Sequence, residues 1–346
     1  MNNLSLNKVI AFGITLSIFL AYFQMWEIIQ SFEGNLKLNI DATFGVLNGE
    51  PNIRIFQNRI LGPYLFKFIM QVSGSGAFMS FLLTIFLLSF LMYFLLLLCS
   101  YDITKSLSFA SGVIFAAATL STIFMQGKWI YLWDFIDFII VTLIIWSWVS
   151  KKSILFISFI AFIGFFNREL TLIILSWMIC LAVINLTILK KNITNDDIDR
   201  YKKIFFSSFF LLIVGIFLIE FLRTHFLINP VGSELYKDII DANANYQFKL
   251  IENIDRLWET IESLLVLKFT KFQIYNFSIF FSFFIFLLGI KVKNKSISEL
   301  SGLALMMLAS TIFFGNIYES RVWISFTPLI ITIYLGVLNA SKIRKL

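Results

Sequence analysis

Carboxylates and guanidinium groups stand at the ends of apolar runs in this sequence, where charged side chains are otherwise rare. Asp134 and Asp137 are three residues apart and therefore share one face of a helix. Asn167, Arg168 and Glu169 interrupt another apolar stretch. Because a charge beside hydrocarbon is costly, each of these side chains is expected to face protein or a polar cavity. They are therefore candidates for substrate binding or catalysis.

Two further groups of charged residues lie in segments between apolar runs. Asp41 and Arg59 form one group, and Glu319 and Arg321 form the other. A carboxylate can deprotonate or orient a hydroxyl, and arginine binds phosphate through two parallel hydrogen bonds. We therefore predict catalytic roles for three carboxylates and substrate-binding roles for six other residues. The catalytic set is Asp41, Asp134 and Glu169, and the substrate-binding set is Arg59, Asp137, Asn167, Arg168, Glu319 and Arg321.

Each group also has an interpretation in which it only supports the fold. Asp134 and Asp137 would pair with Lys128 or Arg168 to hold helices together. Arg168 and Glu169 would neutralise each other within their own turn. The remaining charges would anchor their segments at the membrane surface. The sequence leaves both interpretations open.

A metal site is a further alternative. Asp41, Asp134 and Asp137 would hold Mg²⁺ or Mn²⁺ together with water if they met in space. A zinc site of the usual type needs three or four His or Cys ligands. The chain has 1 His and 2 Cys, and both cysteines lie in apolar runs, so neither a zinc site nor a thiolate nucleophile is expected.

The elements that must position these residues are membrane helices. Of the 346 residues, 59% are hydrophobic and 14% are charged, against about 25% charged in an ordinary soluble protein. A soluble fold cannot bury that much apolar surface. The composition therefore excludes cytosolic enzymes, nucleic-acid-binding proteins and disordered proteins. It predicts an all-α polytopic membrane protein with one transmembrane domain over residues 1–346.

About ten apolar runs are long enough, or nearly so, to cross a bilayer. The stretch 153–189 would form a helix of about 55 Å, which is too long for one crossing of a core of about 30 Å. We therefore expect a polar turn at 167–169 to divide it into two helices. The predicted spans are 7–29, 77–99, 105–125, 130–149, 153–166, 170–189, 204–225, 273–290, 299–315 and 322–340.

The distribution of basic residues predicts the orientation of the spans. With both termini in the cytoplasm, the cytoplasmic segments hold more than half of the 28 basic residues but only about a quarter of the 21 acidic ones. This agrees with the positive-inside rule. The candidate site residues then all lie on the outer side. Two outer segments are long: 30–76, where interfacial helices are expected, and 226–272, where an amphipathic helix is expected.

The arrangement of these outer segments resembles that of the GT-C membrane glycosyltransferases, which use sugars linked to a lipid phosphate. In that family an acidic residue of the first outer segment is the catalytic base, and Asp41 is the matching position. Asp41 lacks the acidic neighbour that many members have, so Glu50 and Asp134 are alternatives for the base. Bacterial members are also similar at Arg59-Ile60-Leu61-Gly62-Pro63, Asn167-Arg168-Glu169 and Glu319-Ser320-Arg321.

The resemblance implies a bacterial cytoplasmic-membrane enzyme that moves a sugar from a polyprenyl-phosphate-linked donor to a hydroxyl of a glycan or lipid acceptor. An O-antigen or capsule polymerase or ligase is a second hypothesis, suggested by the segment 226–272 and His225. A flippase or transporter is a third, although the polarity is one-sided and no inverted repeat is visible. Membrane lipids are expected partners. Nucleic acid is not, because the net charge of +7 follows the membrane topology.

Overall fold

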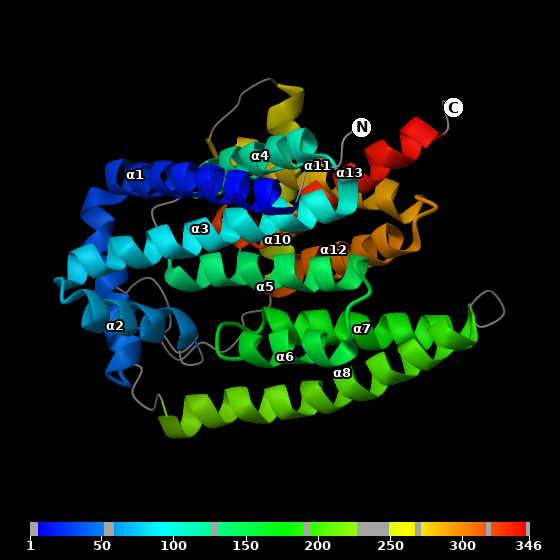
Figure 1. Ribbon diagram of the computed structural model, residues 1–346, viewed down its shortest axis with the longest axis horizontal. Coiled ribbons are helices and arrows are strands. Elements are labelled where there is room, and N and C mark those ends of the chain that lie inside the picture. Colours follow the sequence, from blue (N-terminus) through cyan, green and yellow to red (C-terminus); the bar gives the residue numbers. More distant parts are fainter. Residues whose placement is uncertain are drawn as a thin grey trace.

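The computed structural model describes residues 6–51, 59–125, 130–189, 194–226, 249–266, 271–315 and 320–343. Within these ranges the chain is helical and contains no β-strand (Figure 1). The elements are α1 (Leu6–Leu47), α2 (Leu61–Ser73), α3 (Ala77–Thr104), α4 (Leu107–Met125), α5 (Leu132–Val149), α6 (Ile154–Gly164), α7 (Leu170–Thr187), α8 (Asn195–Phe221), the π-helix η3 (Leu222–Phe226), α10 (Leu250–Leu265), α11 (Lys271–Ile290), α12 (Lys295–Phe314), the 3-10 helix η4 (Ser320–Ile324) and α13 (Thr327–Ile343).

A helix lies at each predicted span. In the described residues, 7 helical segments are long and apolar enough to cross a membrane, and they fall on α1, α3, α4, α5, α7, α8 with η3, and α12. Shorter apolar segments at Ile154–Gly164, Phe281–Ile290 and Val322–Leu338 occupy the remaining predicted positions. The stretch 153–189 is divided as expected, since α6 ends at Gly164 and α7 begins at Leu170. The all-α polytopic fold is therefore confirmed.

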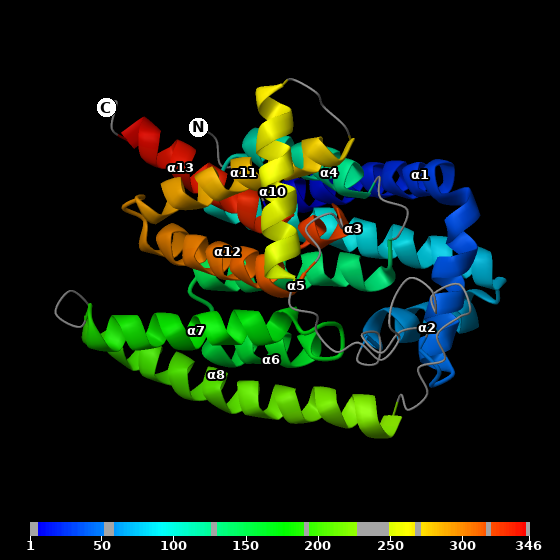
Figure 2. The same ribbon diagram turned by 180° about the vertical axis from the view of Figure 1, so that it is seen from behind.

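The two ends of the bundle carry different kinds of residue. Helices α3 and α4, α5 and α6, and α11 and α12 are joined at one end, and these turns carry the lysines at positions 105, 151–152 and 291–295 (Figures 1 and 2). We call it the lysine end. The start of α5, the α6–α7 turn, the end of α8 and helix α2 lie at the opposite end, which we call the α2 end. The predicted charge asymmetry therefore corresponds to the two ends of one bundle.

The first outer segment differs in part from the prediction. Helix α1 does not end near residue 29 but continues to Leu47. Its first part runs along the bundle, and its last part turns and runs across the α2 end (Figure 1). We call residues 36–47 the transverse segment. Phe44 of this segment packs edge-on against Phe66 of α2, with ring centroids 5.3 Å apart. Residues 52–58, which were expected to continue the interfacial structure, lie outside the described residues.

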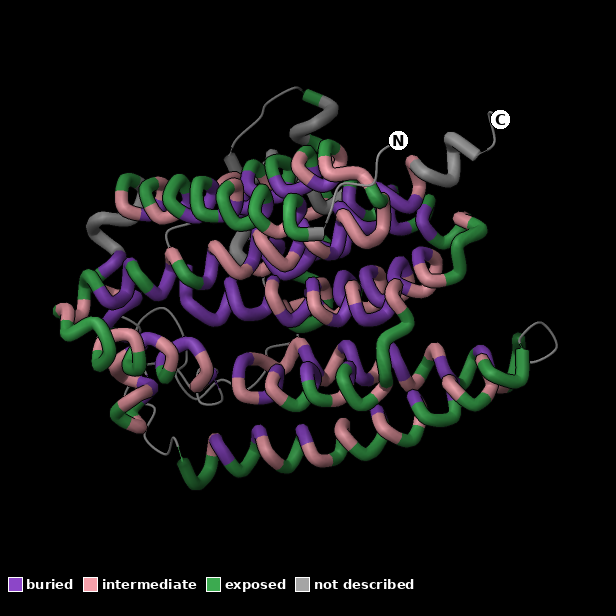
Figure 3. Tube along the Cα trace, in the orientation of Figure 1, coloured by how far each residue is buried: buried purple, intermediate pink, exposed green. Residues whose placement is uncertain are grey.

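Helix α5 is the central helix of the bundle. It contacts α3, α6 and α13 among others, and 78% of its span is buried, against 22% for the span in α8. Figure 3 shows the same contrast between the interior α5 and the peripheral α8. Trp133, Phe135 and Phe138 of α5 are almost completely buried. A helix that is apolar on all sides is expected in the interior of a bundle. The first turn of α5, which carries Asp134 and Asp137, is therefore firmly positioned.

The segment 226–272, which was predicted to be outer, contains the expected amphipathic helix, α10, which runs across α11 and α12 (Figure 2). Asn253 is buried and its Nδ2 donates to two backbone carbonyls at the end of α12, at 2.8 and 2.9 Å. Ile251, Ile254 and Trp258 share one face of the helix and remain exposed. Such an apolar stripe is typical of a helix at a membrane surface. Residues 227–248 lie outside the described part of the chain.

Gly215 in α8 permits a close contact with the α6–α7 turn. A Cβ atom at this position would lie 2.3 Å from the ring of Phe165, which is fully buried. We expect Gly215→Ala to lower the free energy of unfolding by about 1–3 kcal/mol, because the ring or the helix must move. Gly112→Ala in α4 is the matched control, since a Cβ there meets nothing within 4 Å and alanine favours the helix. Equal thermal midpoints for Gly215→Ala and the wild type in detergent would contradict this packing.

Candidate functional site

The start of α5 carries the two carboxylates of the candidate site, Asp134 and Asp137. Oδ2 of Asp134 accepts a hydrogen bond from the backbone N–H of Tyr131 at 3.1 Å, and the N–H of Asp134 donates to the Tyr131 carbonyl at 3.0 Å. A carboxylate in the first turn of a helix also interacts favourably with the helix dipole. Asp134 is 1% exposed. The capping interaction and the burial together fix the orientation of this carboxylate.

Arg168, from the α6–α7 turn, joins the two carboxylates of α5. Its Nη1 lies 3.2 Å from Oδ1 of Asp134 and 3.0 Å from Oδ2 of Asp137. The Asp134 and Asp137 side chains are 0% and 3% exposed, whereas the Arg168 side chain keeps 16% of its surface exposed. A buried ion pair is tolerated only where further hydrogen bonds satisfy the remaining polar atoms. The second oxygen of each carboxylate meets this condition. Oδ2 of Asp134 accepts from the backbone N–H of Tyr131, and Oδ1 of Asp137 accepts from Nδ2 of Asn167.

Asn167 joins the α6–α7 turn to α5 through two hydrogen bonds. Its Nδ2 donates to Oδ1 of Asp137 at 2.7 Å and to the carbonyl of Trp133 at 3.0 Å. The turn itself is tight, because a Cβ on Gly164 would lie 2.2 Å from Oγ1 of Thr171. A residue larger than glycine would therefore push α6 and α7 apart. The tight backbone of this turn and the hydrogen bonds of the Asn167 amide together hold Arg168 in place.

The segment that precedes α2 closes another side of the site. The backbone N–H groups of Ile60 and Leu61 donate to the carbonyl of Phe166, at 2.9 and 3.1 Å. Arg59 is 4% exposed, and its guanidinium carbon lies 5.2 Å from the centre of the Trp133 ring. A cation at this distance is attracted by the negative face of the indole. A second guanidinium group therefore approaches the same turn of α5.

The Glu169 carboxylate forms an ion pair with Arg223, just beyond the end of α8, and not with its neighbour in sequence, Arg168. Its Oε1 accepts a hydrogen bond from Nη2 of Arg223, in η3, and both side chains are largely buried. The transverse segment of α1 is followed by a turn that reaches the same place, since a Cβ on Gly49 would lie 3.7 Å from the carbonyl of Phe226. The turn after α1 and the residue before α7 therefore both approach η3 at the α2 end.

The structure brings several predicted site residues together. Asp134, Asp137, Asn167 and Arg168 form one hydrogen-bonded group, and Arg59 reaches it through Trp133. The interpretation in which Arg168 pairs with the two aspartates is correct in geometry. The interpretation in which it pairs with Glu169 is not, because Glu169 is paired with Arg223. Lys128 lies outside the described residues.

Within the described part of the chain, the predicted base Asp41 is not part of this group. Asp41 lies on the transverse segment with an exposed side chain, and among the described residues no hydrogen bond or ion pair joins it to the group. Its neighbours Asn39 and Thr43 are buried, so Asp41 occupies the outward face of that segment. Glu319 lies outside the described residues, and of Arg321 only the backbone, in η4, is described.

The predicted set of metal ligands does not assemble. Within the described ranges, no group of three or more His, Cys, Asp or Glu residues is arranged to hold a metal ion. Asp134 and Asp137 are neighbours, but Arg168 and Asn167 occupy the positions beside their oxygens where an ion would bind. Asp41, Asp134 and Asp137 are therefore not arranged as one metal site.

Sequence reasoning missed two members of the site. Arg223 was visible as a charge at the end of a span, but nothing in the sequence identified Glu169 as its partner. Trp133 was not among the predicted site residues, but its ring lies under Arg59 and its carbonyl accepts a hydrogen bond from Asn167. The available signal was its position directly before Asp134 at the start of a buried helix.

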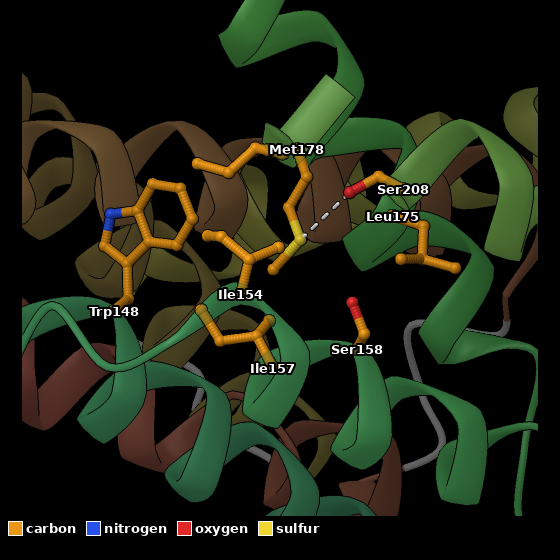
Figure 4. A pocket seen from close by; sticks show the side chains of 8 residues that line it. Trp148, Ile154, Ile157, Ser158, Leu175, Met178 and Ser208 are labelled. Atoms are coloured by element: carbon orange, nitrogen blue, oxygen red, sulfur yellow. Dashed lines mark hydrogen bonds between the residues drawn. The ribbon is translucent and has the colours of Figure 1, made fainter. Parts of the chain in front are cut away.

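A small cavity near the other end of α5 is not a substrate site (Figure 4). Its volume of about 10 Å³ holds about one water molecule. Its lining is mainly apolar, and the Ser208 hydroxyl in it already donates to Sδ of Met178 at 3.5 Å. This cavity between α5, α6, α7 and α8 is therefore a gap in the packing.

No protein-family model, curated protein or solved structure matches the chain. What the protein does is therefore inferred from the site. The site offers a guanidinium group that is fixed by two buried carboxylates and remains partly exposed, a second guanidinium group over the ring of Trp133, and an exposed carboxylate at the same end of the bundle. These groups suit a substrate that has an anionic part and a hydroxyl.

Proposed function

We propose that the protein is a membrane glycosyltransferase that moves a sugar from a polyprenyl-phosphate-linked donor to a hydroxyl of a glycan or lipid acceptor. The observation that supports this most is the group formed by Asp134, Arg168 and Asp137 at the α2 end of an otherwise apolar bundle. A donor with an isoprenoid tail approaches such a site from the bilayer. Its phosphate requires a cation with several donors, which arginine supplies.

In this proposal the two arginines bind the donor phosphate. Arg168 uses the exposed part of its side chain, while Asp134 and Asp137 hold the guanidinium in one orientation. Arg59 is held against the indole of Trp133 and supplies the second cation. Asp134 and Asp137 are positioning residues here, because their oxygens are engaged by protein donors.

The exposed carboxylate of Asp41 acts as the base. It takes the proton from the acceptor hydroxyl, whose oxygen then forms a bond to the anomeric carbon of the sugar. The bond between that carbon and the phosphate oxygen breaks, and polyprenyl phosphate leaves with the electron pair. The arginines stabilise the negative charge on the leaving phosphate. Glu169 supports the site through its ion pair with Arg223.

The proposed location is the cytoplasmic membrane of a bacterium. The lysine-rich turns would lie in the cytoplasm with both termini, and the α2 end would face outward. This orientation gives the site access to donors whose sugar has already been moved to the outer leaflet.

The test is sugar transfer by purified protein in liposomes. The liposomes contain polyprenyl-phosphate-linked sugars labelled in the sugar, together with a lipid extract as acceptor. We expect one labelled sugar per acceptor and a matching release of polyprenyl phosphate. Arg59→Gln should raise the donor KM about tenfold, because it removes one charged hydrogen-bond partner of the phosphate. Lys67→Gln is the control, since Lys67 is an exposed cation of α2.

Other outcomes would replace the proposal. Long labelled chains built from preassembled repeat units would identify a polymerase or ligase. Movement of the labelled lipid to the other leaflet without a chemical product would identify a flippase. An unaltered donor KM in Arg59→Gln would remove this arginine from the donor site.

A further inference from the structure

A larger cavity lies at the lysine end, between the last turns of α7 and the first turns of α12. Its volume is about 510 Å³. The two helices are neighbours in both views of the bundle (Figures 1 and 2). This groove is far from the candidate active site, because α7 runs the length of the bundle between them. The proposed glycosyltransfer does not use it.

One rim of the groove is basic. Lys293 is exposed and makes no ion pair with a carboxylate among the described residues. Nζ of Lys295 lies 3.8 Å from Oδ2 of Asp197 and 4.8 Å from the centre of the Tyr201 ring, and the lysine side chain remains partly exposed. The groove therefore presents two cations at the level where the membrane meets water.

The acid in the groove is already engaged. The two carboxylate oxygens of Glu299 accept hydrogen bonds from Nε1 of Trp148, at 3.0 Å, and from the hydroxyl of Tyr201. Nε1 of Trp177 donates to the Glu299 backbone carbonyl at 3.1 Å. Glu299 therefore supports the wall of the groove. The positive charges of Lys293 and Lys295 then favour an anionic ligand.

A buried amide side chain also belongs to the lining of the groove. Asn185 is 1% exposed and lines the cavity, and its Nδ2 donates to the carbonyl of Leu181 at 2.9 Å. Its Oδ1 accepts no hydrogen bond from any residue that the structure describes. A buried acceptor that is left unpaired costs about 1–3 kcal/mol. A ligand with a hydroxyl group would satisfy it.

The rest of the lining is mainly apolar. Leu181, Ile184 and Met306 form the walls, and Ile184 is largely exposed. Gly302 also lines the groove beside Trp177, and a Cβ there would make only an ordinary van der Waals contact with Nε1 of Trp177, at 3.5 Å. Acyl chains fit such walls, whereas a free anion would use only the rim.

From the basic rim, the unpaired amide and the apolar walls, we infer that this groove binds an anionic glycerophospholipid with a hydroxyl-bearing head group, of the phosphatidylglycerol class. The phosphate meets Lys293 and Lys295, a head-group hydroxyl donates to Oδ1 of Asn185, and the acyl chains lie along α7 and α12. The lipid comes from the leaflet at the lysine end.

Cys180 provides the readout for a test. It lines the groove and is exposed, whereas Cys99, the other cysteine, is buried. The full chain in detergent is treated with N-ethylmaleimide while dioleoyl phosphatidylglycerol is titrated, and intact mass gives the rate of addition to Cys180. We expect protection by phosphatidylglycerol, and none by phosphatidylcholine or by glycerol phosphate without acyl chains. Lys293→Gln should weaken the protection about fivefold.

The controls separate this site from general attraction. Lys291→Gln removes an equal charge from the same turn but not from the groove, and should change the affinity less than twofold. Asn185→Leu should abolish the preference for phosphatidylglycerol over phosphatidylmethanol, an anionic lipid without a hydroxyl. Equal protection by phosphatidylcholine, or equal losses in Lys291→Gln and Lys293→Gln, would overturn the inference. So would protection by glycerol phosphate alone, which would indicate a site for a soluble anion.

Discussion

Replacing Asp41 by asparagine is expected to lower the turnover of sugar transfer by about 10²- to 10⁴-fold, the usual contribution of a general base. The stability should change by less than about 0.5 kcal/mol, because the side chain is exposed and makes no ion pair among the described residues. Donor binding should be nearly unchanged, since the proposed phosphate ligands are arginines. The expected signature is therefore a loss of kcat at constant thermal midpoint and nearly constant donor KM.

Glu50→Gln is the matched control for Asp41→Asn. Glu50 is also an exposed carboxylate, and it follows the transverse segment by a few residues. Its removal changes the local charge by the same amount but should leave turnover within about twofold, because a surface charge acts only weakly at a distance. Normal turnover in Asp41→Asn together with a large loss in Glu50→Gln would transfer the role of base to Glu50. Normal turnover in both would remove these two carboxylates from the chemistry.

The helices were predictable because the length of an apolar run is a direct measure of how a chain crosses hydrocarbon. The break at 167–169 was predictable for the same reason, since one helix over 153–189 would exceed the bilayer. The structure separates α6 and α7 there. Hydropathy reports where a chain leaves the hydrocarbon and not where its helix ends. Helix α1 therefore continues to Leu47 through residues whose composition no longer resembles a span.

The partners of the charged residues were less predictable than their locations. The spacing of Asp134 and Asp137 shows that they share a helix face, but it leaves open which cation meets them. That cation is Arg168, 34 and 31 residues away in sequence. The adjacent Glu169 is the closer acid in sequence, yet it turns to Arg223, 54 residues away. These choices depend on how α5, α7 and α8 pack, which local sequence does not encode.

Arg168→Gln is expected to cause the largest loss of stability among single changes at the site. It leaves the Asp134 and Asp137 carboxylates, 0% and 3% exposed, without their shared cation. Removing one partner of a buried ion pair typically costs about 3–5 kcal/mol, because the remaining charge is neither solvated nor paired. Unfolding in a detergent series should detect the change. A loss below about 1 kcal/mol would mean that the carboxylates are not charged or not dry in the folded protein.

The triple variant Asp134→Asn, Asp137→Asn, Arg168→Gln distinguishes support of the fold from binding of the donor. It removes all three charges and replaces them with neutral amides, so most of the stability lost in Arg168→Gln should return. Sugar transfer should not return, because the guanidinium that meets the phosphate is still absent. If activity returned with stability, the two aspartates and Arg168 would be a structural clamp only. The proposed donor site would then depend on Arg59 and the cation–π contact that holds it over Trp133.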